Sequence, residues 1–274
     1  MRRLLALLVV TIVLGIAQGA NAGPFEDGVT VHNGKDYATA LSLWKPLAAQ
    51  GDAKAQTNLG VMHERGQGVT QDYKEAARWF GLAAAQGLAN AQYSLGVMYG
   101  AGKGMPQDYK EAVRLYGLAA AQGYAPAQYN LGVMYANGQG VPQDYKEAVR
   151  LYGLAAAQGY AQAQYNLGVM HANGQGVPQD YKEAVRLYGL ATAQGYANAQ
   201  NNLGFMYHNG QGVPQNYARA HMWYNLAASS SSGEDGKRAI ENRDEIAAKM
   251  TSAQLEQAQE MARKCKASSF KNCD

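Results

Sequence analysis

Histidine and cysteine are the side chains best suited to acid–base catalysis or metal binding. This 274-residue chain has five histidines and two cysteines. His63 and His171 could each act as a general base near neutral pH. In successive copies of a repeated segment they occupy the same position as Tyr99, Tyr135 and Tyr207. A position filled by either His or Tyr favours aromatic packing, so we do not expect catalysis there.

The other three histidines also lack suitable neighbours. His221 lies beside Met222 and Trp223, which favours packing. His208 falls at a loop-side position where we expect it to be solvated, and His32 precedes a turn with no visible partner. No Ser, His and acidic constellation and no metal-ligand spacing stands out. We therefore predict a protein that is not an enzyme, with no catalytic residue, no cofactor and no metal site.

The two cysteines, Cys265 and Cys273, both lie close to the C-terminus. In an oxidising compartment a short disulfide loop is their simplest role. A metal site is the alternative, but no histidine lies near them in the sequence, and two thiols provide only half of a tetrahedral ligand set. We favour the disulfide.

The segment Gly100–Gly104 superficially resembles a phosphate-binding loop because a lysine lies among glycines. The phosphate-binding pattern needs a Gly five residues before Gly102, where this chain has Val97, and a Ser or Thr after Lys103. In the last three units the same segment reads Asn-Gly-Gln-Gly. We therefore interpret it as a turn.

Residues 1–22 have the features of a cleaved secretory signal: Arg2 and Arg3, an apolar stretch of 13 residues, and a small-residue cleavage site at Ala20-Asn21-Ala22. A membrane span needs about 20 apolar residues, so an anchor is less favoured. Without Arg2 and Arg3, 22 of the 24 Lys and Arg remain against 21 Asp and Glu. A charge so close to zero argues against a nucleic-acid-binding protein.

Most of the chain consists of a 36-residue repeat. Residues 123–158 recur as residues 159–194 with three changes, and looser copies occupy residues 51–86, 87–122 and 195–230. A fixed period of this size is typical of a solenoid, in which each unit packs mainly on its neighbours. Nearly identical units present a repeated surface and not one asymmetric site. The pattern therefore favours binding over catalysis.

Each unit is predicted to be a helical hairpin. In residues 123–158, apolar residues at spacings of three and four predict a first helix over about 125–136, which the glycines of Asn-Gly-Gln-Gly end. Asp144 begins a second helix, Glu147 follows three residues later as in a capping box, and Gly159 ends it. We expect one apolar stripe inside the hairpin and another against the next unit.

Two series of glycines lie inside these helices, where glycine costs about 1 kcal/mol relative to Ala. We expect both series to mark places where two helices approach with no room for a Cβ atom. The series in the first helix is Gly60, Gly96, Gly132, Gly168 and Gly204, and the series in the second helix is Gly81, Gly117, Gly153 and Gly189.

Partial units are expected to close both ends of the solenoid. Residues 23–50 form an N-terminal cap, and Pro46 should kink or shorten its second helix. Residues 231–274 follow a serine-rich break and should form two capping helices, the second opening at Thr251, and the disulfide tail.

The segments Ala127–Tyr135 (AQYNLGVMY) and Asn137–Ala148 (NGQGVPQDYKEA) resemble the Sel-one-like repeat (SLR) family, a relative of tetratricopeptide repeats. The resemblance covers all five units. It implies an all-α fold, namely a right-handed α/α superhelical solenoid with capping helices at both ends. Members mostly act as adaptors or scaffolds in protein complexes, and exported bacterial members fit the N-terminal signal.

The resemblance also implies which residues would face a partner. By analogy with tetratricopeptide units, the first helices line a concave groove suited to a peptide with apolar anchors. The groove tyrosines could instead be half-buried packing residues, and the asparagines could instead hydrogen-bond between packed helices. The candidate partner-binding residues are Tyr93, Tyr129, Tyr165, Val97, Val133, Val169, Phe205, Asn130, Asn166 and Asn202.

We therefore predict an exported scaffold, periplasmic or secreted, that binds protein or peptide partners of the cell envelope. No nucleic acid, small molecule or membrane insertion of the mature chain is expected. One alternative is a β-lactam-binding or hydrolysing enzyme, as in a cysteine-rich branch of the family, but the paired cysteines of that branch are missing from all five units. The other alternative is a module that binds envelope glycan or peptidoglycan through its tyrosines.

Overall fold

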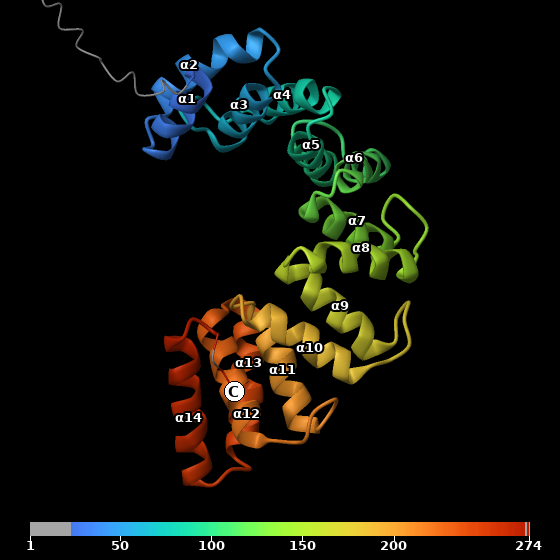
Figure 1. The fold of residues 1–274 in the computed structure, drawn as a ribbon, viewed down its shortest axis with the longest axis vertical. Helices are drawn as coiled ribbons and strands as arrows, with labels where there is room; N and C mark the ends of the chain where they lie inside the picture. The colour runs from blue at the N-terminus through green and yellow to red at the C-terminus, as the bar shows by residue number, and fades with distance from the viewer. Residues whose placement is uncertain (1–22, 272, 274) are drawn as a thin grey trace, which may run out of the picture.

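The structure is a computed structural model that describes residues 23–271 and 273, so the expected signal peptide lies outside the described residues. Over the described residues the chain forms 14 helices and no strand, which confirms the all-α prediction. The helices follow one another in an open arc that runs from the N-terminal to the C-terminal end (Figure 1). Among the described helices, none has the length and apolar character needed to cross a membrane.

Ten helices form five hairpins, one for each repeat. The local signals in the sequence account for their bounds. For example, Asp144 accepts hydrogen bonds from the backbone N–H groups of Lys146 and Glu147 at 2.9 and 3.0 Å, and Gly138 ends the preceding helix with φ of 67°. The first helices are α3 (Ala53–Arg65), α5 (Ala89–Ala101), α7 (Ala125–Asn137), α9 (Ala161–Asn173) and α11 (Ala197–Asn209), and the second helices are α4 (Tyr73–Ala85), α6 (Tyr109–Ala121), α8 (Tyr145–Ala157), α10 (Tyr181–Thr192) and α12 (Tyr217–Ser230).

The N-terminal cap consists of α1 (Pro24–Asn33) and α2 (Tyr37–Ala49). Pro46 lies inside α2, yet α2 has 13 residues, as many as α3, so the expected shortening is wrong. The expectation that His32 lacks a partner is also wrong. Its Nε2 lies 3.1 Å from Oε1 of Gln67, and its ring packs on the rings of Tyr37 and Trp44.

The glycines of the first helices do allow close packing. A Cβ atom on Gly132 would lie 2.8 Å from the Tyr152 ring, and the other members of that series face an aromatic ring in the same way. The expectation for the second helices is wrong. A Cβ atom on Gly153 would meet nothing within 4 Å, and the same holds for Gly81, Gly117 and Gly189. Those four glycines lie on an open face, where close packing does not explain them.

Two capping helices, α13 (Gly233–Ala247) and α14 (Ser252–Ala267), follow the last repeat. Thr251 and Gln254 form the predicted capping box at the start of α14. Ile246 of α13 and Cys265 of α14 are both fully buried. The cap thus supplies apolar side chains where a sixth repeat would otherwise continue the core.

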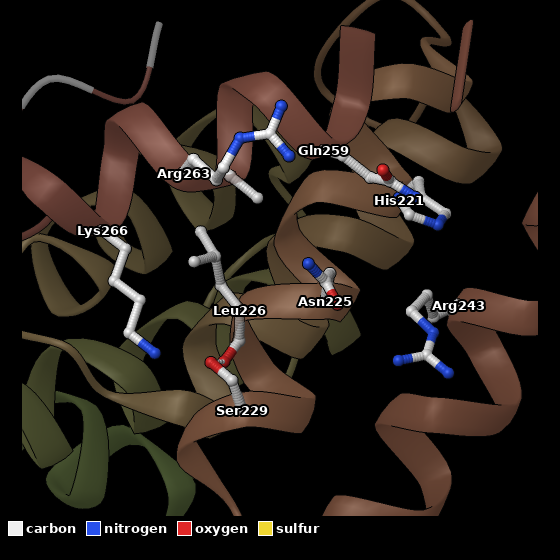
Figure 2. A pocket seen from close by; sticks show the side chains of 9 residues that line it. His221, Asn225, Leu226, Ser229, Arg243, Gln259, Arg263 and Lys266 are labelled. Carbon is white, nitrogen blue, oxygen red and sulfur yellow. Dashed lines mark hydrogen bonds between the residues drawn. The ribbon is translucent and has the colours of Figure 1, made fainter. Parts of the chain in front are cut away.

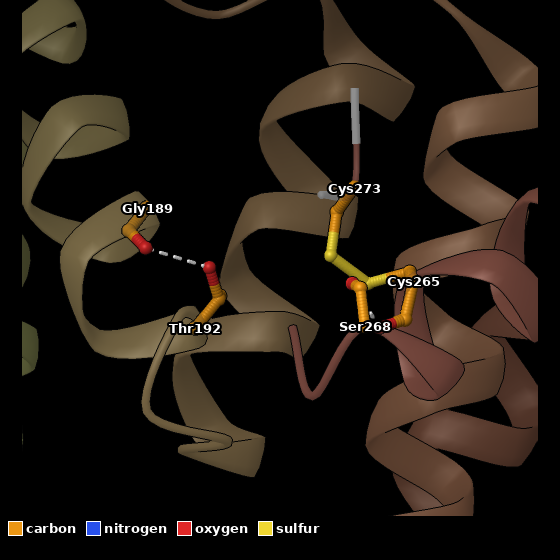
Figure 3. The surroundings of a disulfide bond; sticks show 5 residues. All are labelled: Gly189, Thr192, Cys265, Ser268 and Cys273. Carbon is orange, nitrogen blue, oxygen red and sulfur yellow. Dashed lines mark hydrogen bonds between the residues drawn. A yellow bond between two sulfur atoms is a disulfide. The ribbon is translucent and has the colours of Figure 1, made fainter. Parts of the chain in front are cut away.

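The structure pairs Cys265 at the end of α14 with Cys273 in the tail (Figure 3). Both cysteines belong to the same apolar cluster as Ala191 of α10 and Trp223 of α12. Phe270 lies close to Gly195, at the turn between α10 and α11. The tail therefore folds back against the last two repeats.

Candidate partner-binding pockets between repeats

One pocket recurs at three successive junctions between repeats. The junctions of repeats 2 and 3, 3 and 4, and 4 and 5 hold pockets of ≈ 350, 240 and 400 Å³. Eight positions line all three pockets, each spaced by 36 residues along the chain. In the first pocket these positions are Gly100, Ala101, Tyr109, Tyr116, Asn130, Val133, Met134 and Gln139.

Residues of two neighbouring repeats form each pocket. In the pocket between repeats 3 and 4, Tyr145 and Tyr152 come from α8, whereas Asn166 and Met170 come from α9. The loop before α8 is held in place by Gln143, whose Nε2 donates to the backbone carbonyl of Ala136 at 2.7 Å. The pocket therefore exists only because successive hairpins stack in a fixed register.

Tyrosine rings form a repeated cluster beside each pocket. Tyr129 lies 5.8 Å from Tyr152 and 5.4 Å from Tyr160, measured between ring centroids. Tyr93 and Tyr165 make the equivalent pairs in the neighbouring repeats. Each of these groove tyrosines thus packs against two others, one of which belongs to the next repeat.

Burial keeps the tyrosine hydroxyls neutral. It raises the pKa of Tyr152 to about 12, and a hydrogen bond with Asn166 offsets only part of that effect. Burial likewise raises the pKa of Tyr188 to about 12, offset in part by Asn202. The asparagines therefore hydrogen-bond tyrosines of the preceding repeat, and the pocket walls carry no charge at neutral pH.

The ten predicted partner-binding residues fall into two groups. Eight line one or more of the three pockets, and Val169 lines two of them. Phe205 is 49% exposed, although the corresponding positions hold valine in other repeats. Tyr93 and Tyr129 do not line these pockets and lie half-buried in the tyrosine clusters. The eight lining residues are Tyr165, Val97, Val133, Val169, Phe205, Asn130, Asn166 and Asn202.

Sequence reasoning missed the pocket residues that come from the second helix and the loop. Tyr145 and Tyr152 of α8, and Gln175 of the loop after α9, line the pocket between repeats 3 and 4. The recurrence of these residues every 36 positions was the only sign in the sequence that they share a role. It did not show which of the recurring residues contact one another at the junction between two repeats.

The histidines considered as possible general bases, His63 and His171, are partly buried. Their Nδ1 atoms are buried without a hydrogen-bond partner among the described residues, and each histidine acts electrostatically on a glutamate of the second helix of its own repeat, Glu75 or Glu183. Within residues 23–271 and 273, no group of three or more His, Cys, Asp and Glu side chains could hold a metal ion. His208 is partly buried and lies edge-on to Tyr217, with ring centroids 5.9 Å apart.

A repeated pair of charged side chains lies on the second helices, and no charged residue is among the described residues that line the three repeated pockets. Arg150 pairs with Glu147 at 2.7 Å, and the same pair recurs in three other repeats at 2.6 Å. Exposed pairs of this kind add little stability. Beside them, Leu82, Leu118, Leu154 and Leu190 are each 41–43% exposed.

The chain matches the model of the Sel1 repeat at residues 53–88, 89–124, 125–160, 161–196 and 197–232. It is 28% identical to a Sel1 repeat protein from Oxalobacter formigenes, with 82% of this chain and 97% of that one covered and a TM-score of 0.73. A putative Sel1 repeat protein from Klebsiella pneumoniae is 25% identical, with 75% and 98% covered and a TM-score of 0.48.

A protective antigen of uropathogenic Escherichia coli with an SLR fold is also 25% identical, with 90% of this chain and 69% of that one covered and a TM-score of 0.44. No curated protein matches the chain significantly. The matched repeats begin two residues later than the 36-residue units defined from the sequence.

Proposed function

Because this chain belongs to the Sel1 repeat family, we propose that it is an exported, non-catalytic scaffold that binds an extended segment of a protein partner along the pockets between its repeats. The observation that carries this proposal is the recurrence of one pocket, built from the same eight positions, at three junctions. A row of similar pockets suits a ligand that is itself extended, such as a polypeptide.

The pocket chemistry defines the kind of segment that would fit. The lining is uncharged, with apolar surface from valine, methionine and tyrosine and hydrogen-bonding groups from asparagine and glutamine. Apolar side chains of the partner would enter the pockets, and the amides would bond to its backbone. Phe205, with 49% of its surface exposed, is the most exposed large apolar side chain among the described residues that line these pockets.

Export rests on the N-terminal sequence, with Arg2 and Arg3 followed by an apolar stretch, and is supported by the Cys265–Cys273 disulfide. Disulfides persist in oxidising compartments such as the bacterial periplasm. The partner would then be a protein of the cell envelope or of the surrounding medium.

Selection of short peptides from a random library displayed on phage tests the proposal, because it does not require the partner to be identified first. We expect the wild-type chain to enrich peptides with spaced apolar residues. V169E and F205E should weaken binding of these peptides by about tenfold or more, because each puts a charge into a pocket. Circular dichroism would verify that both variants remain helical.

L154E is the matched control, since Leu154 is 42% exposed on the second helix and does not line the three pockets. It should leave peptide binding unchanged. If no peptide is enriched, or if L154E weakens binding as much as V169E does, the row of pockets is not the binding surface.

A further inference from the structure

A separate cavity of ≈ 380 Å³ lies between the last repeat and the C-terminal cap. His221, Asn225, Leu226 and Ser229 of α12 form one wall. Arg243 of α13 and the α14 residues Gln259, Ala262, Arg263 and Lys266 form the others. Figure 2 shows Arg243 on one side and Arg263 with Lys266 on the other, with Asn225 and Leu226 between them.

The last repeat departs from the repeated sequence at the residues that line this cavity. In the preceding repeat the positions equivalent to His221, Asn225 and Ser229 hold apolar or small residues, namely Val185, Gly189 and Ala193. The three earlier repeats likewise have Ala or Val, Gly and Ala there. Three polar side chains thus appear only where α13 and α14 enclose the surface of the second helix.

Three of the residues that line the cavity are basic and, among the described lining residues, none is acidic, although two of the three are paired with carboxylates outside the lining. Arg243 and Arg263 use Nε and Nη2 to bind Asp244 and Glu260, with contacts of 2.7–3.0 Å. Each guanidinium therefore keeps N–H donors, because Arg carries five in total. The amine of Lys266 makes no hydrogen bond or ion pair with another described residue.

Neutral polar groups in the cavity also lack hydrogen-bond partners among the described residues. His221 is 95% buried, with 5% of its surface exposed, and its Nδ1 has no hydrogen-bond partner in the described part of the chain. The side-chain amides of Asn225 and Gln259 likewise make no hydrogen bond with described residues. Only His221 is buried, whereas Asn225 is partly buried and Gln259 is exposed. A buried polar group without a partner costs about 1–3 kcal/mol, so the unpaired Nδ1 of His221 is unfavourable unless a ligand or water satisfies it.

We propose that this cavity, which we name the cap cavity, binds a small anionic molecule that carries phosphate or carboxylate groups. Arg243, Arg263 and Lys266 would provide the charge, and Asn225 and Gln259 would donate hydrogen bonds to its oxygen atoms. Its volume is within the range of small-molecule sites. An anion held by α12, α13 and α14 at once would also tie the cap to the last repeat.

Thermal unfolding of the mature chain tests the proposal with inorganic phosphate and citrate as probes, against sodium chloride of equal ionic strength. A ligand that binds only the folded state raises the midpoint temperature of unfolding. We expect this midpoint to be higher in phosphate or citrate than in sodium chloride. K266Q should reduce that rise by at least half, and R263Q combined with K266Q should leave only the general stabilisation that these kosmotropic anions give a folded protein.

K264Q is the matched control, because Lys264 lies on the same helix and carries the same charge but does not line the cap cavity. K264Q should show the same rise of the unfolding midpoint as the wild type. Imidazole NMR signals of His221 provide a second measurement that does not depend on stability, and the probe should shift them in the wild type. Equal midpoints in all three salts, an equal response of K264Q and K266Q, or unmoved His221 signals would overturn the proposal.

Discussion

Gln158 donates a hydrogen bond from its Nε2 to Oε1 of Gln128 at 2.8 Å, across 30 residues of sequence. Gln128 is buried at the start of α7, and its own Nε2 donates to the carbonyl of Ala120 at the end of α6. One side chain thus joins the second helices of two successive repeats. The pairs Gln86–Gln56, Gln122–Gln92 and Gln194–Gln164 repeat the contact.

Q158S should destabilise the protein by about 1–2 kcal/mol, since it leaves the buried Oε1 of Gln128 without a donor. Thermal or urea unfolding measures the change. A157S is the control, because it introduces the same residue one position earlier at an exposed site. If the two variants unfold together, the glutamine pair contributes nothing to stability.

The last repeat lacks this pair, because Ser230 occupies the position of Gln158. Gln200 is fully buried there, and neither atom of its amide has a partner among the described residues. S230Q should restore the missing donor and stabilise the protein by about 1 kcal/mol.

A double-mutant cycle attributes that gain to the pair. In the Q200A background, S230Q should give no stabilisation, because the acceptor is gone. An equal gain in both backgrounds would show that the new glutamine acts through some other contact.

The two glycine series should respond to alanine in opposite directions. G132A should destabilise by about 1–3 kcal/mol, because the new Cβ would lie 2.8 Å from the ring of Tyr152. G153A should stabilise by about 1 kcal/mol, since nothing lies within 4 Å and alanine favours the helix. The unfolding midpoints of the two variants measure these changes. A loss of stability in G153A would contradict the open face seen in the structure.

The helices could be predicted from the sequence because their signals are local. Asp144 caps a helix, and Gly138 ends one, whatever the neighbouring repeat does. The pockets could not be predicted, because Tyr152 and Asn166 meet only after two hairpins stack. The error at Gly153 has a related cause, since periodicity cannot distinguish a face packed against another helix from an open one. Local signals therefore predict the helices of each repeat, whereas the contacts between repeats depend on how the hairpins stack.

The buried tyrosines should make stability fall at alkaline pH. Burial raises the pKa of Tyr93, Tyr152 and Tyr188 from 10.0 to about 12. Their folded-state pKa values lie above those of the unfolded chain, so their protonated forms stabilise the fold fully below pH 10. That stabilisation should be lost progressively as the pH rises from 10 toward 12.

Urea unfolding across this pH range, followed together with phenolate absorbance, measures the effect. The buried tyrosines should ionise only as the helices melt, so absorbance and helicity should change together above pH 10. Y188F should lose less stability than the wild type over that interval, because phenylalanine has no proton to release. If these tyrosines titrate near pH 10 with the helices intact, their hydroxyls are accessible to water, and the junction between repeats is looser than the structure indicates.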